Sequence, residues 1–351
     1  MKKQLPALAA LAVLGAASGV VQAQPAEISL YFPTASSSFV TLFGIADAAI
    51  GKATSAGDQK WGFQSNSIVT SNARSMMGLT GKEDLGGGSW AGFAYSGQVD
   101  LSTGEGGGFT REAFVSLGNN NWGTVMLGRN YSPGFIGQIT YELTHFSQYS
   151  VIGDTFGPGA SPDPFRSAQI EYMTPFFYGL RATLAYIPKA DGVLVDAGTS
   201  NLSDEWAMNV VYDQGPIKAA LTADKPSHTQ MGGNANKTNW TLGGSYMFGN
   251  SFVLSASYNR TNDAQHWQGA PSAVFGARRY GFELGGSVFM GPFSVTLDLT
   301  RDTKNELYGG KKYTNGLLEG RYNLSKRTYL YVDYLRLDGD SNYGLGIDHT
   351  F

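Results

Sequence analysis

The stretch from Asn239 to Asn259 reads NWTLGGSYMFGNSFVLSASYN and carries the pattern that decides the fold. In its first half, every second residue from Trp240 to Tyr246 lies on one face. Trp240, Leu242 and Tyr246 on this face are large and apolar, and Gly244 is the exception. The residues between them are small or polar: Asn239, Thr241, Gly243 and Ser245. After the short turn around Gly249, the same alternation resumes from Phe252. Period-two alternation on both sides of a short turn predicts two antiparallel β-strands joined as a hairpin.

The same pattern recurs along the chain, in the runs 206–212, 217–223, 280–288, 293–299 and 343–351. Runs of about ten residues with one apolar face and one small or polar face are typical of a transmembrane β-barrel, because only a closed barrel pairs every strand backbone in lipid. A soluble β-sandwich also has alternating strands. Three features favour the barrel: the strand lengths, the aromatic residues at the ends of apolar faces, and the hydrophilic second face. We therefore predict an all-β protein with a transmembrane antiparallel β-barrel.

Connections between the runs alternate in length. Short turns such as 213–215, 248–250 and 290–291 alternate with long polar stretches such as 223–238, 260–279 and 301–315. Outer-membrane barrels have short turns on one rim and long loops on the extracellular rim. At roughly 20 residues per strand with its connection, the chain predicts about 16 strands around an aqueous lumen.

Composition excludes several other functions. Charged residues make up 15% of the 351 residues, against about 25% in an ordinary soluble domain. The absence of cysteine excludes disulfides, Cys-ligated zinc and thiol catalysis. A net charge of −3 gives no reason to expect nucleic-acid binding. Four scattered histidines and no metal or nucleophile motif predict neither a cofactor nor an enzyme, although a barrel enzyme with a dispersed triad stays an alternative.

The N-terminus has the order of features of an export signal. A basic start, Met1 to Lys3, precedes an apolar run from Leu5 to Val21, and Val21-Gln22-Ala23 fits a small-x-Ala cleavage site. We expect cleavage after Ala23, which removes residues 1–23 and leaves 24–351 as the barrel. A membrane anchor is the alternative. The role of residues 24–36 is open.

Several stretches resemble the general porins of Gram-negative bacteria, especially those of the Burkholderia, Bordetella, Comamonas and Neisseria group. The stretches are FVTLFGIAD at 39–47, GKEDLGGG at 81–88, FTREAFVSL at 109–117, WGTVMLGRNY at 122–131, LSKRTYLY at 324–331 and the final HTF at 349–351. The resemblance spans roughly residues 37 to 351. It implies a homotrimer of 16-stranded pores in the Gram-negative outer membrane, in contact with outer-membrane lipid and lipopolysaccharide. It also implies that Phe351 is the signal for the barrel-insertion machinery.

The expected function is that of a general diffusion porin for ions and small hydrophilic solutes. A substrate-specific outer-membrane channel is the alternative. Gly86, Gly87 and Gly88 are predicted to form a hairpin turn, because glycine adopts a positive φ without penalty. A phosphate-binding loop would need a Gly-Lys-Ser/Thr sequence and a following helix, which are absent.

One segment, 131–164, does not alternate and is rich in Gly and Pro. Loops this long without regular structure are usually functional. By the resemblance it is the third extracellular loop, which folds into the lumen and narrows it. Its acids are Glu142, Asp154 and Asp163. An ordinary surface loop is the alternative, but the aromatic residues of the segment favour packing against a wall.

By the resemblance, the opposite side of the lumen carries arginines: Arg74, Arg111, Arg129 and Arg166. The position that the family fills with arginine in the second strand is Met76 here, and Arg74 lies two residues away on the same face. Arginines facing loop carboxylates would set up a transverse field, and their excess predicts a weak anion preference. The alternative for each arginine is a rim residue that pairs with a loop acid.

Overall fold

The computed structural model describes residues 38–54, 61–65, 71–157, 164–188, 204–225, 237–264 and 277–351. These residues form one antiparallel sheet of 17 strands and two short helices. The strands are β1 (Phe39–Ala53), β2 (Gly62–Gln64), β3 (Met76–Gly86), β4 (Ser89–Gln98), β5 (Glu112–Asn119), β6 (Gly123–Tyr131), β7 (Phe165–Met173), β8 (Leu180–Ile187), β9 (Glu205–Gln214), β10 (Ile217–Lys225), β11 (Asn239–Phe248), β12 (Phe252–Ala264), β13 (Ala277–Met290), β14 (Phe293–Asn305), β15 (Thr314–Asn323), β16 (Thr328–Leu337) and β17 (Asp340–Thr350). The helices are α1 (Pro133–Ile139) and α2 (Val151–Phe156). The predicted signal segment 1–23 and Asp163 lie outside the described residues.

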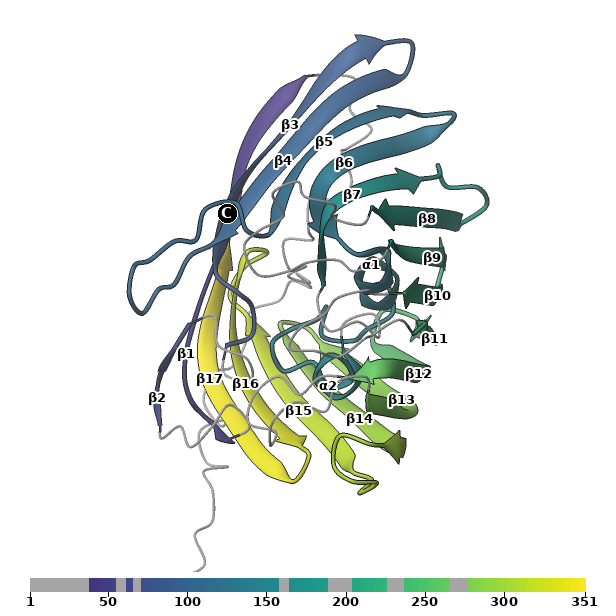
Figure 1. Ribbon diagram of the computed structural model, residues 1–351. Helices are drawn as coiled ribbons and strands as arrows, with labels where there is room; N and C mark the ends of the chain where they lie inside the picture. The colour runs from purple at the N-terminus through teal and green to yellow at the C-terminus, as the bar shows by residue number, and fades with distance from the viewer. Residues whose placement is uncertain are drawn as a thin grey trace, which may run out of the picture.

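The sheet closes on itself (Figure 1). β1 pairs with β17 on one side, from Ile45 opposite Thr350 to Ala53 opposite Asn342. On its other side β1 pairs first with β3 and then, farther along, with the three-residue β2. β2 therefore continues the line of β3, and among the described residues the ring has 16 strands. The prediction of a closed antiparallel barrel of about 16 strands is confirmed.

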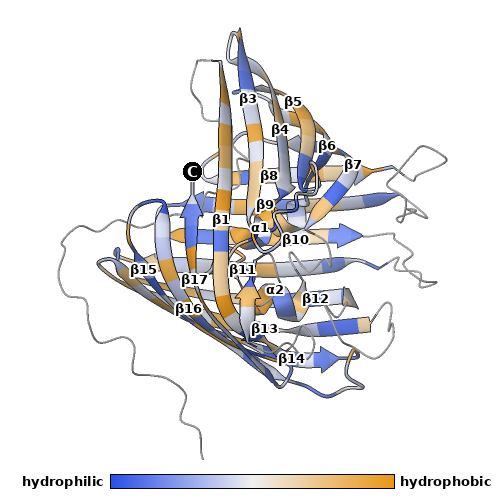
Figure 2. Ribbon diagram, turned by 90° about the vertical axis from the view of Figure 1, so that its left-hand side faces the viewer, coloured by the Kyte–Doolittle hydropathy of each residue, from blue (hydrophilic) through white to orange (hydrophobic). Residues whose placement is uncertain are grey.

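The two faces of the wall differ as the alternation predicts. In β14, Leu297 and Leu299 are exposed on the outside, whereas Thr296 and Asp298 are buried toward the inside. The last strand follows the same rule, with Leu345 and Ile347 exposed and Asp348 buried. Figure 2 shows hydrophobic positions recurring along the strands between hydrophilic ones. Apolar side chains on the outside match a lipid environment.

The predicted glycine turn joins β3 to β4. Gly86, Gly87 and Gly88 have φ angles of 79°, 60° and 76°, the left-handed region that only glycine enters without strain. This tight turn lies at the rim opposite the long segment 132–164. Within the described residues, no helix is long and apolar enough to cross a membrane.

The described part of the segment between β6 and β7, which holds α1 and α2, turns back into the ring and lies against its inner face (Figure 1). Asn209 of β9 donates a hydrogen bond of 2.7 Å to the carbonyl of Pro133 at the start of α1. Thr261 of β12 donates one of 2.6 Å to the carbonyl of Phe156 at the end of α2. Both donors are buried residues on the inward faces of their strands.

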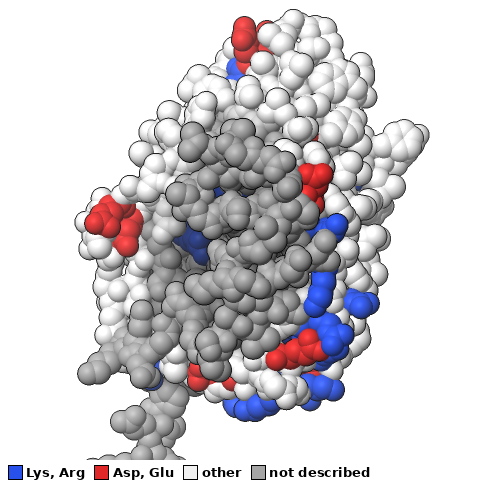
Figure 3. Space-filling view, viewed as in Figure 1, with Lys and Arg blue, Asp and Glu red and all other residues white. Residues whose placement is uncertain are grey.

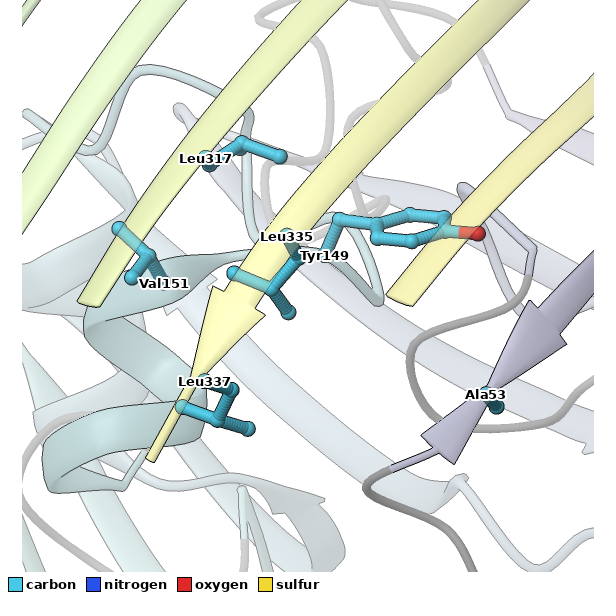
Figure 4. Packing of buried hydrophobic residues seen from close by; sticks show 6 residues of the cluster. All are labelled: Ala53, Tyr149, Val151, Leu317, Leu335 and Leu337. Atoms are coloured by element: carbon cyan, nitrogen blue, oxygen red, sulfur yellow. The ribbon is translucent and has the colours of Figure 1, made fainter. Parts of the chain in front are cut away.

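Apolar packing also fixes the second half of this segment. Tyr149 and Val151 are fully buried, and they pack against Leu317 of β15 and Leu335 of β16 (Figure 4). α2 therefore joins a core shared with the wall strands.

Candidate functional site

The lumen beside the loop contains a cavity of about 380 Å³. Its lining comes from the segment 72–74, from the loop with α1 and α2, and from the strands β1, β3, β6 to β10, β15 and β16. Five basic side chains line it: Arg74, Arg111, Arg181, Lys218 and Arg321. Two carboxylates line it: Asp154 and Asp213. The charged lining of this cavity is therefore predominantly positive.

Arg74 reaches the cavity because the chain leaves the strand ladder between β2 and β3. The carboxylate of Asp47 accepts a hydrogen bond of 3.0 Å from the backbone N–H of Ala73, and Ser75 bonds to the backbone of Asp47. The Nε of Arg74 donates to Gln148 of the loop at 3.0 Å. The guanidinium thus bridges the wall and the loop.

Arg111 is held by aromatic residues. Its guanidinium donates to the hydroxyl of Tyr131 at 2.6 Å and lies 5.2 Å from the ring centroid of Phe165. Stacking on a ring face suits a guanidinium, which stays charged and is weakly hydrated. Arg111 therefore presents a permanent charge beside an apolar surface.

Arg321 of β15 connects three parts of the molecule. It pairs with Glu319 at 2.7 Å, and it donates to Asn72 at 3.2 Å and to the carbonyl of Thr144 at 3.4 Å. The partly exposed His145 next to this site has its pKa lowered to about 4, by desolvation and by the positive charges of Arg321 and Lys218. His145 is therefore neutral at physiological pH.

Two further cavity cations lie on β8 and β10, which are among the strands that α1 packs against. The Arg181 guanidinium lies 4.3 Å from the ring centroid of Phe176, which is in the turn between β7 and β8. Lys218 faces Asp213 at 4.0 Å, and both side chains are about two-fifths exposed. A pair so exposed and so loosely spaced is screened by water.

Sequence reasoning missed Arg181, Lys218 and Arg321. All three lie inside regular strands, at positions that share a face with buried polar residues such as Thr183 and Thr222. Counting in twos along each strand would have found them.

The four predicted arginines separate into two groups. Arg74 and Arg111 line the cavity, whereas Arg129 and Arg166 are not among its lining residues. Arg129 donates 2.6 Å hydrogen bonds to the carbonyl of Thr110 and the hydroxyl of Ser167. It follows Gly128, where the register between β6 and β7 shifts, so that alternation does not fix its direction.

Arg166 is buried within the inner wall. It lies 3.1 Å from Asp224 of β10 and 3.7 Å from Glu205 of β9. These partners are strand carboxylates, and two of them face one guanidinium. Within the described residues Arg166 thus contacts the wall strands, and its place opposite the loop acids stays a prediction, since Asp163 lies outside the described residues.

Glu142 lies inside the loop. Its carboxylate is buried and accepts four hydrogen bonds within the loop, of 2.6–2.8 Å, from the N–H and hydroxyl of Thr144, the N–H of Phe146 and the hydroxyl of Ser150. Burial raises its pKa, while these hydrogen bonds oppose the rise. Glu142 organises the loop and is not among the residues lining the cavity.

Asp154 in α2 does line the cavity. Burial raises the pKa of Asp154 well above its ordinary value, the negative charge of Asp338 raises it further, and Arg74 opposes the rise. Its Oδ2 atom is buried without a hydrogen-bond partner. Asp154 is the one predicted loop acid that the described residues place at the cavity.

Apolar and uncharged polar side chains share the rest of the loop face, the polar ones being Thr140, Thr144, His145, Ser147, Gln148 and Ser150. Phe135, Ile136 and Ile139 of α1 line the cavity together with Phe146. The ring of Phe146 contacts that of Phe135 edge-on, with centroids 4.9 Å apart. The described part of the loop thus presents an apolar cluster at the cavity beside polar side chains and the carboxylate of Asp154.

The final predicted residue, Phe351, lies at the barrel seam. Its backbone exchanges hydrogen bonds of 3.1 and 3.2 Å with Gly44 of β1. A β-carbon at position 44 would collide with the Phe351 ring, so glycine lets the ring cover the seam. Recognition of Phe351 by insertion machinery stays a prediction. Among the described residues, no three His, Asp or Glu side chains are grouped to hold a metal ion.

Comparison with known proteins places this fold and site in a family. A model described as Gram-negative porin matches residues 7–342. Outer membrane porin protein 32 of Delftia acidovorans is 34% identical over 265 residues, which are 71% of this chain and 67% of that protein. An outer membrane porin protein of Bordetella pertussis is 28% identical over an alignment that covers 100% of both chains. The anion-selective porin from Comamonas acidovorans superposes with a TM-score of 0.72 at 27% identity, covering 90% of this chain and 100% of that one.

Proposed function

The chain belongs to the Gram-negative porin family, and from this premise we propose that it forms an outer-membrane diffusion channel that prefers anions. Ions and small hydrophilic solutes would pass down their gradients, without catalysis or a cofactor. The observation that carries the anion preference is the cavity lining, with five basic side chains against two carboxylates. The structurally similar Comamonas porin, which is named as anion-selective, supports it.

The physical basis is the field inside a narrow passage with low-dielectric walls. Such walls focus the field of the lining charges, which raises the local concentration of the opposite ion. Rings of basic residues favour anions. Four of the five lining cations are arginines, whose weakly hydrated guanidinium groups suit a narrow passage.

Planar-bilayer conductance tests the proposed channel against the alternative of a substrate-specific one. A diffusion channel is expected to show a large single-channel conductance that rises with KCl concentration without saturating. A specific channel would show small steps that saturate and are blocked by one solute. Small, saturating steps would overturn the proposed function.

The assembly and processing expected from the family are part of this proposal. We expect a homotrimer, which would give conductance steps in groups of three, and cleavage after Ala23 on export. Native mass spectrometry of the protein purified from outer membranes measures both, from the complex mass and the mass of the released chain. A monomer that begins with Met1 would contradict both.

Contact with lipopolysaccharide is supported by charges on the outside of the barrel. We define the basic rim patch as the outward cations near the long-loop ends of the strands β12 to β16: Arg260, Arg278, Arg301, Lys304 and Arg336. Figure 3 shows Lys and Arg gathering at the lower right, where Figure 1 places the ends of β12 to β14. Lipid phosphates lie at this depth of a membrane, so that the patch fits a phosphorylated head group.

The patch is held in place by an aromatic ring. Arg260 of β12 and Lys304 of β14, on the two strands that flank β13, lie 4.9 and 5.6 Å from the ring centroid of Tyr280. Glu306 binds both Arg278, at 2.6 Å, and Lys304, at 3.2 Å. The Glu306 carboxylate thus holds two cations of the patch in place, and the five cations together keep a net positive charge.

A further inference from the structure

The cavity combines two kinds of surface that a purely ionic channel does not need together. Its cations project from the wall and from the segment 72–74, and the loop contributes the apolar Phe135, Ile136, Ile139 and Phe146 beside polar side chains that include Asp154. Glu142, which would have made the loop side acidic, is turned into the loop by four hydrogen bonds. An ion that crosses this point meets positive charge and hydrocarbon at once.

The apolar side is pre-organised. Tyr131 packs against Phe135 with centroids 5.0 Å apart and against Phe165 with centroids 4.3 Å apart, and Phe146 completes the row against Phe135. Ile139 and Phe146 are the members of this row that stay partly exposed. They are therefore available to contact a solute without rearrangement of the cluster.

The positive side touches the same cluster. The Arg111 guanidinium lies 5.2 Å from the Phe165 ring centroid and 5.8 Å from that of Tyr131. Arg74 lines the cavity beside Gln148 of the loop. A carboxylate bound to these guanidinium groups would hold its hydrocarbon part within reach of the loop.

We propose that this cavity favours organic monocarboxylates with an apolar body, of the aromatic or branched aliphatic kind, over equally charged hydrophilic carboxylates. The inference rests on the proposed anion channel and adds its solute class. A guanidinium recognises a carboxylate by paired, charge-assisted hydrogen bonds. An apolar body displaces water from the Ile139 and Phe146 surface, whereas a hydroxylated body must give up hydrogen bonds with water there.

The size of the site agrees with a small organic solute. Sites for small molecules have volumes of about 300–1,000 Å³ and are mostly apolar with a few placed polar groups. The cavity of about 380 Å³ lies at the lower end of that range. It therefore suits a single-ring carboxylate better than a large or extended ligand.

The test compares benzoate with threonate, which has the same charge and the same number of non-hydrogen atoms but a hydroxylated body. Reversal potentials of the reconstituted wild-type channel give the permeability of each anion relative to chloride. We expect benzoate to be several-fold more permeant than threonate, and threonate to diffuse as its size dictates. Equal permeabilities of benzoate and threonate, with the preference for chloride over potassium intact, would overturn the inference.

Two variants locate the effect. We expect Ile139→Ser to lower the benzoate-to-threonate permeability ratio about threefold, because it removes apolar contact area. Leu143→Ser is the matched control, since Leu143 lies in the same loop but contacts the β13 side near Gly285 rather than the cavity. An equal loss in both variants would contradict the assignment to the Ile139 surface. Loss of chloride preference in the wild type would instead refute the proposed function.

Discussion

The carboxylate of Glu142 accepts a hydrogen bond of 2.7 Å from the backbone N–H of Phe146. His145 and Phe146 have φ angles of 55° and 58°, in the left-handed region that costs about 1–2 kcal/mol for each residue with a side chain. The carboxylate also binds Thr144, just before this turn. Glu142 thus stabilises the strained turn that brings Phe146 to the cavity.

Glu142→Gln is expected to destabilise the loop by about 3 kcal/mol, because an amide offers fewer acceptor sites and leaves buried donors unpaired. Hydrogen exchange of the backbone amides from Thr144 to Ser150 measures the effect, and these amides should exchange much faster than in the wild type. Glu105→Gln, on an exposed loop, is the control and should change nothing. Unaltered protection in Glu142→Gln would show that other contacts hold the turn.

Arg111 and Arg166 should respond differently to neutralisation. Arg111→Gln removes a cation from the cavity lining and should reduce the chloride-to-potassium permeability ratio. Arg166→Gln leaves Glu205 and Asp224 buried without their cation, which costs about 3–5 kcal/mol. It should lower the temperature at which the folded barrel unfolds in detergent, with a smaller effect on selectivity. A larger loss of selectivity in Arg166→Gln than in Arg111→Gln would show that Arg166 acts on permeating ions.

Anion preference should fall as pH rises through the raised pKa of Asp154. Below that pKa the carboxyl is neutral and the cavity is more positive, and above it a negative charge faces Arg74, Asp338 and Glu142. Because the pKa of Asp154 is raised in the folded protein, the neutral carboxyl stabilises the packing of α2 at low pH. This stability is lost as the pH rises through the folded-state pKa of Asp154. His145 does not interfere, because its pKa is lowered to about 4.

Reversal potentials in a KCl gradient, recorded from about pH 5 to pH 9, measure this dependence. Asp154→Asn should keep the low-pH preference across the range, since it mimics the neutral acid. If the variant retains the full wild-type pH dependence, another group is responsible.

The basic rim patch should bind a phosphorylated lipid. Native mass spectrometry of delipidated protein in detergent should show adducts with bis-phosphorylated lipid A, and fewer in the double variant Arg301→Gln/Lys304→Gln. Lys52→Gln, an outward lysine near the same rim on β1, is the matched control. Inorganic phosphate separates the two sources of the group: if it competes fully at equal concentration, the patch is a free-anion site rather than a lipid site.

Much of the fold could be predicted because alternation is a local property of each strand. The faces of the last strand, with Leu345 outward and Asp348 inward, follow from the sequence alone. The division of the second strand into β2 and β3 could not, because it depends on Asp47 binding the backbone of Ala73 from a neighbouring strand.

The side-chain directions at the site were less predictable, because the alternation fails where several of these residues lie. Arg129 and Arg166 lie next to a register shift between β6 and β7, where a bulge breaks the alternation that would give their direction. The orientation of Glu142 depends on donors in its own folded loop, which no periodicity describes. Lys218 and Arg321 lie in regular strands, so that their inward direction could have been predicted from the alternation.

The central claim is that the lumen is a water-filled passage with a positive field. The most direct test is the reversal potential of the reconstituted wild-type protein between two KCl solutions of different concentration. We predict a potential of the sign set by chloride, with an ohmic conductance. A potential of the sign set by potassium, or a bilayer that stays sealed, would contradict it.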